Sequence, residues 1–355
     1  MKIQSIKVWL QQLPLTKPYT IAYKTIEDTE IIFLEITLQN GIVGLGASNP
    51  FAEVVGETPA ITLANLQTDF VQQMVGRDVR HFNQLLDEAI TQFPHLPGTI
   101  AAIDIALHDA FCQLTGIAVV DLYGRKMNAL PTSITIGIKD TAAMLEEAKS
   151  NYAAGFKVIK IKTGLDVEQD IERVAKLTEQ FGNKMLIRVD ANQGYDLPQL
   201  KHFMEKTKQL AIELIEQPLK VGKENELASL DKSERKMLAA DESLLDAASA
   251  LQLAHPPTPY GIFNIKLMKC GGIRGAREIA TIAAAAGIDL FWGCNDESIV
   301  SITAALHAAF SCSNTKYLDL DGSFDLSSDL VTGGFILKDG VMYCGDGAGV
   351  GVRRL

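Results

Sequence analysis

Two lysines, Lys160 and Lys162, stand inside the run "VIKIKTG" at 158–164, whose other residues are typical of a buried strand. β-Branched residues followed by Gly164 favour a strand that ends in a turn. Alternate side chains of a strand share one face, so both ammonium groups point the same way. Their chemistry would be proton transfer or the binding of anionic oxygens, unless the pair simply extends to the rim of the fold.

Carboxylates occupy matching places on the next three apolar runs. Asp190 ends "MLIRVD", Glu216 ends "IELIE" and Asp241 follows "KMLAA". One such carboxylate can be a solvated loop charge or a helix cap, but three buried together require a cation. Oxygen ligands without Cys or His suit a hard divalent ion, so we expect one Mg²⁺ per subunit, with Mn²⁺ as the second choice.

These residues lie in a regular alternation of short apolar runs and amphipathic stretches. The expected strands are 132–138, 156–164, 185–194, 212–219, 236–243, 261–272, 288–298 and 315–322, whose starts lie 24–29 residues apart. Strands that alternate with helices indicate an α/β protein with a parallel sheet, and eight such units can close into a (β/α)8 or TIM barrel. The alternative, an open doubly wound sheet, is disfavoured because no Gly-rich phosphate turn occurs.

The regions that flank this alternation show other sequence patterns. Residues 1–125 combine antiparallel strand and hairpin signals with helical stretches and predict an α+β capping domain. The barrel should occupy 126–322, and 323–355 should return as strands and turns to complete the cap. The cap would cover the barrel mouth, where the carboxyl ends of the strands present their side chains.

Composition narrows the class of protein. The 355 residues carry a net charge of −10, which disfavours nucleic acid and anionic membranes as partners. No run of 18 apolar residues and no signal peptide is found, so we expect a cytoplasmic protein. Five scattered cysteines argue against a disulfide framework or a thiolate zinc site. The expected partner is a small-molecule substrate, with a homo-oligomer possible.

The ring geometry of a barrel adds two features. Strands 2 and 6 face each other, so Lys162 and Lys266 would flank a metal-bound substrate as general bases, and a nearby Mg²⁺ and Lys160 would disfavour their protonated forms. Lys160 would also bind an anionic oxygen. After strand 8, Asp319 and Asp321 of "LDLD" share one face across the ring from the metal ligands, where they would hold a cation at the far end of the substrate.

With these residues in place, the chain resembles the enolase superfamily, in its muconate-lactonizing-enzyme subgroup, over nearly its whole length. The matching motifs are KxK at 160–162, "DANQG" at 190–194, "EQP" at 216–218, "ADES" at 240–243 and "NIKLMKCGG" at 264–272. The resemblance implies that Asp190, Glu216 and Asp241 bind Mg²⁺ and that Lys162 and Lys266 are the catalytic bases. It also implies removal of the proton next to a carboxylate to give an enediolate.

Within the subgroup, the second half of the reaction depends on other residues. Two opposed lysines permit proton removal from one face and return to the other, which makes the protein an isomerase. The DxD at 319–321 resembles that of dipeptide epimerases such as L-Ala-D/L-Glu epimerase, where the pair binds the amino terminus, and Thr135 matches a substrate-contacting position. Cycloisomerases and o-succinylbenzoate synthases share the lysines and stay as alternatives, while a non-catalytic binding protein would lack them.

Specificity depends on less regular positions. Lys24 aligns with an arginine that meets the glutamate carboxylate in Ala-Glu enzymes, and strand 7 ends "GCNDES", which adds Cys294 and Asp296. We expect epimerisation of Ala-Xaa dipeptides with a small or apolar second residue, inverted at the α-carbon of that residue. The alternatives are L-Ala-D/L-Glu dipeptides and cationic dipeptides, the latter drawn by Asp296.

Overall fold

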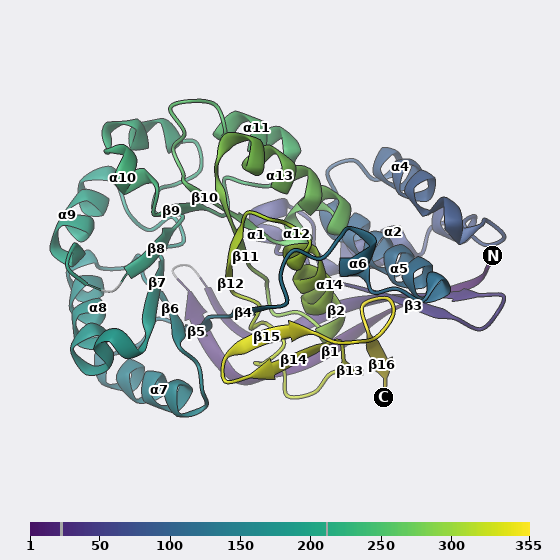
Figure 1. Cartoon of the computed structure of the whole chain (residues 1–355), viewed down its shortest axis with the longest axis horizontal. Coiled ribbons are helices and arrows are strands. Elements are labelled where there is room, and N and C mark those ends of the chain that lie inside the picture. Colours follow the sequence, from purple (N-terminus) through teal and green to yellow (C-terminus); the bar gives the residue numbers. More distant parts are fainter. Residues whose placement is uncertain (22–23, 211) are drawn as a thin grey trace.

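The computed structural model describes residues 1–21, 24–210 and 212–355, and its centre is an eight-stranded parallel sheet (Figure 1). The strands are β5 (Ile134–Ile136), β6 (Val158–Lys162), β7 (Leu186–Asp190), β8 (Ile212–Glu216), β9 (Leu238–Ala240), β10 (Ile262–Ile265), β11 (Asp289–Trp292) and β12 (Thr315–Leu318). They neighbour one another in chain order. A parallel bridge between Thr132 and Leu318 joins the first strand region to the last and closes the ring. The expected (β/α)8 barrel is confirmed.

Helices follow the strands and cover the outside of the ring. They are α7 (Thr141–Ala153), α8 (Val167–Phe181), η2 (Gly182–Lys184), α9 (Leu197–Thr207), η3 (Glu224–Ser229), α10 (Lys232–Arg235), α11 (Ala247–Leu253), α12 (Leu267–Cys270), α13 (Ile273–Ala286) and α14 (Ile299–Phe310). Their starts follow ordinary capping rules. Asp196 and Gln199, for example, form a capping box at α9, which satisfies amide groups that the first turn leaves unpaired.

The N-terminal third forms the cap. Its antiparallel sheet comprises β1 (Ile3–Ile21), β2 (Lys24–Leu38) and β3 (Val43–Ser48), and its helices are α1 (Ala52–Val55), α2 (Pro59–Leu66), α3 (Asp69–Gln72), η1 (Val79–His81), α4 (Phe82–Gln92), α5 (Pro97–Thr115) and α6 (Val119–Leu122). Helix α5 packs closely on β3, where a side chain at Gly46 would meet the Ala102 carbonyl oxygen at 2.0 Å. In the described part of the chain, no helix is long and apolar enough to cross a membrane.

The C-terminal tail contacts the N-terminal region of the chain. It contains β13 (Val331–Gly333), β14 (Phe335–Lys338), β15 (Val341–Cys344) and β16 (Val352–Arg354), and β15 pairs with β4 (Ala129–Pro131). The Val119 amide donates to the Gly349 carbonyl at 2.9 Å, and Arg354 pairs with Glu35 of β2 at 2.6 Å. Figure 1 shows these yellow strands beside the long purple strands of the cap.

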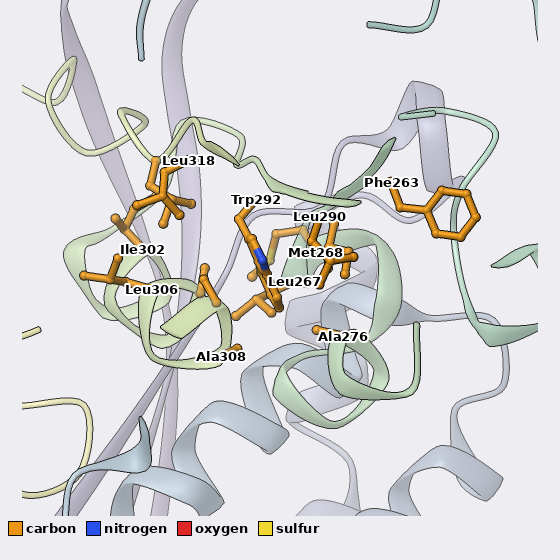
Figure 2. Packing of buried hydrophobic residues seen from close by; sticks show 14 of the residues in the cluster. Phe263, Leu267, Met268, Ala276, Leu290, Trp292, Ile302, Leu306, Ala308 and Leu318 are labelled. Carbon is orange, nitrogen blue, oxygen red and sulfur yellow. The ribbon is translucent and has the colours of Figure 1, made fainter. Parts of the chain in front are cut away.

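Buried side chains occupy two regions of the barrel, one between the strands and the helices and one inside the ring of strands. Outward-facing side chains pack under the helices, and Figure 2 shows Trp292 of β11 among Leu290 and residues of α12 and α14. The Trp292 indole donates to Thr315 at 2.9 Å, so this buried polar atom is satisfied. Inside the ring, Phe291 lies between two cations, with Arg188 at 5.3 Å and Lys160 at 5.6 Å from its ring centre. The ring interior therefore becomes polar toward the carboxyl ends of the strands.

One contact joins the cap to the barrel at a helix start. Helix α13 has no capping side chain of its own, and Gly272 precedes it. Asp104 of α5 supplies the cap, because its carboxylate accepts the Ile273 amide at 2.7 Å and the Arg274 amide at 3.3 Å. Since Asp104 is fully buried, its loss would leave two amide donors without a partner.

We therefore expect Asp104→Ala to lower the free energy of unfolding by about 2 kcal/mol, the upper range for losing a helix cap. Urea unfolding followed by circular dichroism measures this change. Glu205→Ala, on the exposed face of α9, is the matched control and should change stability by less than about 0.5 kcal/mol. Equal unfolding midpoints for the two variants would contradict the capping role.

Candidate active site

The charged residues predicted from the sequence meet at the carboxyl end of the barrel. Lys162 of β6 is in register with Asp190 of β7, and Asp190 is in register with Glu216 of β8. Asp241 and Lys266 directly follow β9 and β10. Because these side chains share the inward face of neighbouring strands, the ring collects them at one end.

Lys160 lies at the centre of this group. Its Nζ atom is 2.8 Å from Glu216 Oε2, 2.8 Å from Asp319 Oδ2 and 3.1 Å from Asp190 Oδ2. All four side chains are buried. Burial lowers the pKa of Lys160, but Asp319 and Glu216 outweigh it and raise that pKa well above its usual value. Lys160 is thus a fixed ammonium that neutralises carboxylates, and it is unsuited to proton abstraction.

Lys162 and Lys266 stand on either side of this centre. Lys162 Nζ lies 2.6 Å from Asp190 Oδ2, and Lys266 Nζ lies 2.8 Å from Asp241 Oδ2. Burial lowers the pKa of Lys266, yet Asp241 and Glu216 raise it above its usual value. Asp241 thus favours the protonated form of Lys266, whereas the expectation of a disfavoured ammonium group applies to a site that also holds Mg²⁺.

Burial and neighbouring charges shift the pKa values of these carboxylates in opposite directions. Burial raises the pKa of Asp190, but Lys162 and Lys160 lower it to about 2. Burial, reinforced by the charge of Asp190, raises the pKa of Glu216 to about 8. A carboxyl group with such a pKa lies where a further positive charge would be stabilised.

The donor set fits a hard divalent cation. In the present arrangement, no three His, Cys, Asp or Glu side chains among the described residues already surround one point as ion ligands, since ammonium groups stand against the carboxylates. Glu216 Oε2 nevertheless accepts no hydrogen bond of good geometry although it is buried. Three carboxylates on adjacent strands, one with a buried oxygen whose partner is an ammonium group, match the oxygen ligands that Mg²⁺ prefers.

The aspartates after β12 share a cation with the carboxylates of the opposite strands. The ammonium group of Lys160 contacts both Asp319 and Glu216. Its other oxygen accepts from Ser133 at 2.6 Å. Asp321 accepts the Thr135 amide at 2.7 Å, and burial together with Asp319 raises the pKa of Asp321 to about 7. The pair forms an acidic end of the site.

Other predicted substrate contacts lie around a cleft of about 490 Å³ between cap and barrel. Cys294 and Asp296 line it, and Asn49 of the cap donates to the Asp296 carbonyl at 2.7 Å, which holds this loop. Thr135 lines an adjoining cavity of about 120 Å³ together with Asp319 and Asp321. The Lys24 side chain lies outside the described residues.

Two residues of the site were not predicted. Lys269 contacts Asp241 Oδ1 and donates to the Asp241 carbonyl at 2.6 Å, and Asn264 donates to Glu216 Oε1 at 2.7 Å. Burial lowers the pKa of Lys269, and the Asp241 carboxylate opposes that effect. Asn264 precedes Lys266 by two positions, so strand alternation alone places it on the inward face and could have identified it.

A (β/α)8 barrel with lysines on opposite sides of a carboxylate cluster defines a class of proton-transferring enzymes. Residues 4–124 match the family model for the mandelate racemase / muconate lactonizing enzyme N-terminal domain, and residues 143–354 match the enolase C-terminal domain-like model. The chain belongs to the enolase superfamily, in its dipeptide epimerase group.

Curated relatives cover the chain from end to end. The L-Lys-D/L-Arg epimerase of Desulforapulum autotrophicum is 50% identical over 100% of both chains, and the hydrophobic dipeptide epimerase of Enterococcus faecalis is 35% identical over 100% of both. The Methylococcus capsulatus dipeptide epimerase, solved with Mg and L-Arg-D-Lys, is 48% identical, covers 99% of each chain and superposes with a TM-score of 0.97. These neighbours confirm Mg²⁺ as the expected cofactor of the group.

We expect Mg²⁺ to stabilise the folded protein, because an ion that binds only the folded state stabilises it by about 2.7 kcal/mol at about a hundredfold excess over its dissociation constant. Metal-free protein should therefore melt at a lower temperature than protein with added Mg²⁺, as differential scanning fluorimetry measures. EDTA should abolish activity and Mg²⁺ should restore it.

Glu216→Gln is the matched variant for this experiment, since it keeps the side-chain size and removes one carboxylate. Its melting temperature should respond much less to Mg²⁺. A wild-type protein whose melting temperature ignores Mg²⁺, or full activity in excess EDTA, would contradict the metal site.

Proposed function

We propose that this protein is a Mg²⁺-dependent epimerase of dipeptides with basic side chains, which inverts the α-carbon of the C-terminal residue. One observation carries the choice of substrate: the cap side of the cleft is lined by acidic residues. The residues that line the cleft include Glu27, Asp28 and Glu30 of β2, Glu53 of α1 and, on the barrel side, Asp296.

The charge of this cleft is one-sided. Among the described residues, its only lysines are three that belong to the catalytic end, namely Lys162, Lys266 and Lys269, and no arginine lines it. A low-dielectric cleft lined by one sign of charge concentrates ligands of the opposite sign. Guanidinium or ammonium side chains of a dipeptide would meet these carboxylates, whereas an acidic side chain would be repelled.

The two ends of the site orient the dipeptide backbone. We assign the substrate carboxylate to the metal end at Asp190, Glu216 and Asp241, and the substrate ammonium to Asp319 and Asp321. The α-carbon of the second residue then lies between the two flanking lysines. In this orientation, the C-terminal side chain enters the acidic cleft beneath the cap, and the N-terminal residue lies in the adjoining cavity.

The proton transfer requires two acid–base groups, and Lys162 and Lys266 supply them. When bound, Mg²⁺ supplies Lewis-acid stabilisation of the charge that develops on the substrate carboxylate. A neutral lysine on one face takes the α-proton, and the ammonium group of the lysine on the other face donates a proton to the same carbon. The centre inverts: one C–H bond breaks as an N–H bond forms at the first lysine, and one N–H bond of the second lysine breaks as the new C–H bond forms. Lys160 keeps its charge throughout and holds the carboxylates in place.

The cationic alternative is preferred here over Ala-Xaa dipeptides. A small apolar pocket would have to be built from Phe51, Tyr19 and Ile21 with Lys24 turned away, and the side chains of Tyr19, Ile21 and Lys24 lie outside the described residues. The described wall of the cleft is acidic and roomy instead. The names of the two relatives at 50% and 48% identity, both L-Lys-D/L-Arg epimerases, support the same preference.

A dipeptide library in D₂O with Mg²⁺ tests this function. Exchange of the α-proton adds one dalton, which mass spectrometry detects, and we expect the fastest exchange in dipeptides with Lys or Arg at the second position. Fastest exchange in Ala-apolar or Ala-Glu dipeptides would overturn the cationic specificity while keeping the epimerase. Absence of exchange in every dipeptide would favour the cycloisomerase or synthase reactions.

The acidic cleft gives a separate prediction. Asp296→Asn should lower kcat/KM for Lys-Arg by about tenfold to a hundredfold, which corresponds to losing a buried charge pair. The same change should leave kcat/KM for Ala-Ala nearly constant, and Glu205→Gln on α9 serves as the charge-matched control. An equal loss for both dipeptides would show that Asp296 supports the fold and does not select charge.

A further inference from the structure

The three carboxylates assigned to the metal share a pattern of contacts that their spacing in the sequence does not explain. Each has one oxygen held by a fixed donor and the other oxygen turned to a lysine of the site. In Asp190, Oδ1 accepts the Asn192 amide at 3.0 Å, and Oδ2 faces Lys162 at 2.6 Å. The backbone donor cannot move away without refolding the loop after β7.

Glu216 and Asp241 repeat this arrangement with side-chain donors. Glu216 Oε1 accepts from Asn264 at 2.7 Å, while Oε2 lies 2.8 Å from Lys160. Asp241 Oδ1 contacts Lys269, while Oδ2 faces Lys266 at 2.8 Å. In every case the second oxygen contacts another lysine of the site, which is Lys162, Lys160 or Lys266.

We infer that Asn264 and Lys269 are positioning residues, which fix one oxygen of Glu216 and of Asp241 so that the other oxygen is presented to the metal. The inference rests on the proposed metal-dependent function. A carboxylate with one oxygen anchored rotates less, so binding a metal through the other oxygen loses less conformational entropy.

Lys269 is built for holding a carboxylate in place. An ammonium group has three donors, and Lys269 has three acceptors: the Asp241 carboxylate, the Asp241 carbonyl and the Asn264 carbonyl at 3.1 Å. No donor is left over for the substrate. Its position on the short helix α12, one turn beyond Lys266, lets both lysines reach the same carboxylate from different sides.

Asn264 is retained at a cost. Its side chain is fully buried, and its Oδ1 atom accepts no hydrogen bond from the described residues. A side chain added at Gly293 would lie 2.7 Å from that oxygen, so the glycine leaves the space that the Asn264 amide occupies. An unsatisfied buried acceptor is unfavourable, and the compensating contact is the bond to Glu216.

The sign of one measurement separates positioning from simple charge. Lys269→Met removes a cation from the neighbourhood of the metal, which on charge alone would tighten Mg²⁺ binding. The positioning role predicts the opposite, a loss of about tenfold to a hundredfold in Mg²⁺ affinity. Asn264→Leu changes no charge and should also weaken Mg²⁺ by about tenfold.

Isothermal titration of Mg²⁺ into metal-free protein gives these affinities without any enzyme assay. Lys316→Met is the matched control and should bind Mg²⁺ like the wild type, because the exposed Lys316 of β12 pairs with Asp289 of β11. In activity assays, the two positioning variants should need more Mg²⁺ but regain most of their kcat when Mg²⁺ is saturating. A merely structural role would lower thermal stability and leave the Mg²⁺ affinity unchanged.

Unaltered or tighter Mg²⁺ binding by Lys269→Met would overturn the role of Lys269, and unaltered binding by Asn264→Leu would overturn that of Asn264. If Lys269→Met does not unfold cooperatively, Lys269→Gln takes its place in the titration. If neither variant folds, the Mg²⁺ affinity of Asn264→Leu decides whether the positioning inference holds. A wild type that binds no Mg²⁺ would instead refute the proposed function, so the two failures are distinguishable.

Discussion

The contact of Lys160 with Glu216, Asp190 and Asp319 is the interaction on which the rest of the site depends. Several carboxylates converge in the buried interior of the barrel, and without a cation among them their burial would be strongly unfavourable. One fixed ammonium makes the cluster tolerable in the folded protein. Burial, reinforced by the charge of Asp190, still raises the pKa of Glu216 to about 8, so a further positive charge beside Glu216 would stabilise its carboxylate.

The four lysines of the site have different partners and therefore different roles. Lys160 and Lys269 are surrounded by acceptors and act on the carboxylates. Lys162 and Lys266 each contact one carboxylate oxygen that the proposed metal would take. Metal and ammonium groups therefore compete for the same oxygens, and a lysine that loses this contact is the one available to the substrate. The cap completes the site by supplying the acidic wall and by holding the Asp296 loop through Asn49.

Much of this architecture could be predicted because a charged residue marks the end of several of the apolar runs that form the strands. Apolar runs that terminate in Asp190, Glu216 or Lys162 identify both the strand and the side chain it presents, and the 24–29-residue spacing predicts the ring. Contacts across the ring could not be predicted in this way. The proximity of Asp319 to Lys160 depends on how the barrel closes, and the raised pKa of Lys266 depends on a carboxylate from the neighbouring strand. The acidic wall depends on where the β1–β2 hairpin lies over the barrel, which no local pattern specifies.

The central claim is that two lysines on opposite faces of one α-carbon exchange its proton. Lys162→Met and Lys266→Met should each be incubated with Mg²⁺ in D₂O with L-Lys-L-Arg and, separately, with L-Lys-D-Arg, and α-deuterium incorporation should be measured by mass spectrometry. The two-base account predicts that neither variant epimerises and that each still exchanges the α-proton of one epimer, a different epimer for each variant. Epimerisation by both variants at the wild-type rate, or exchange of the same epimer by both, would contradict it.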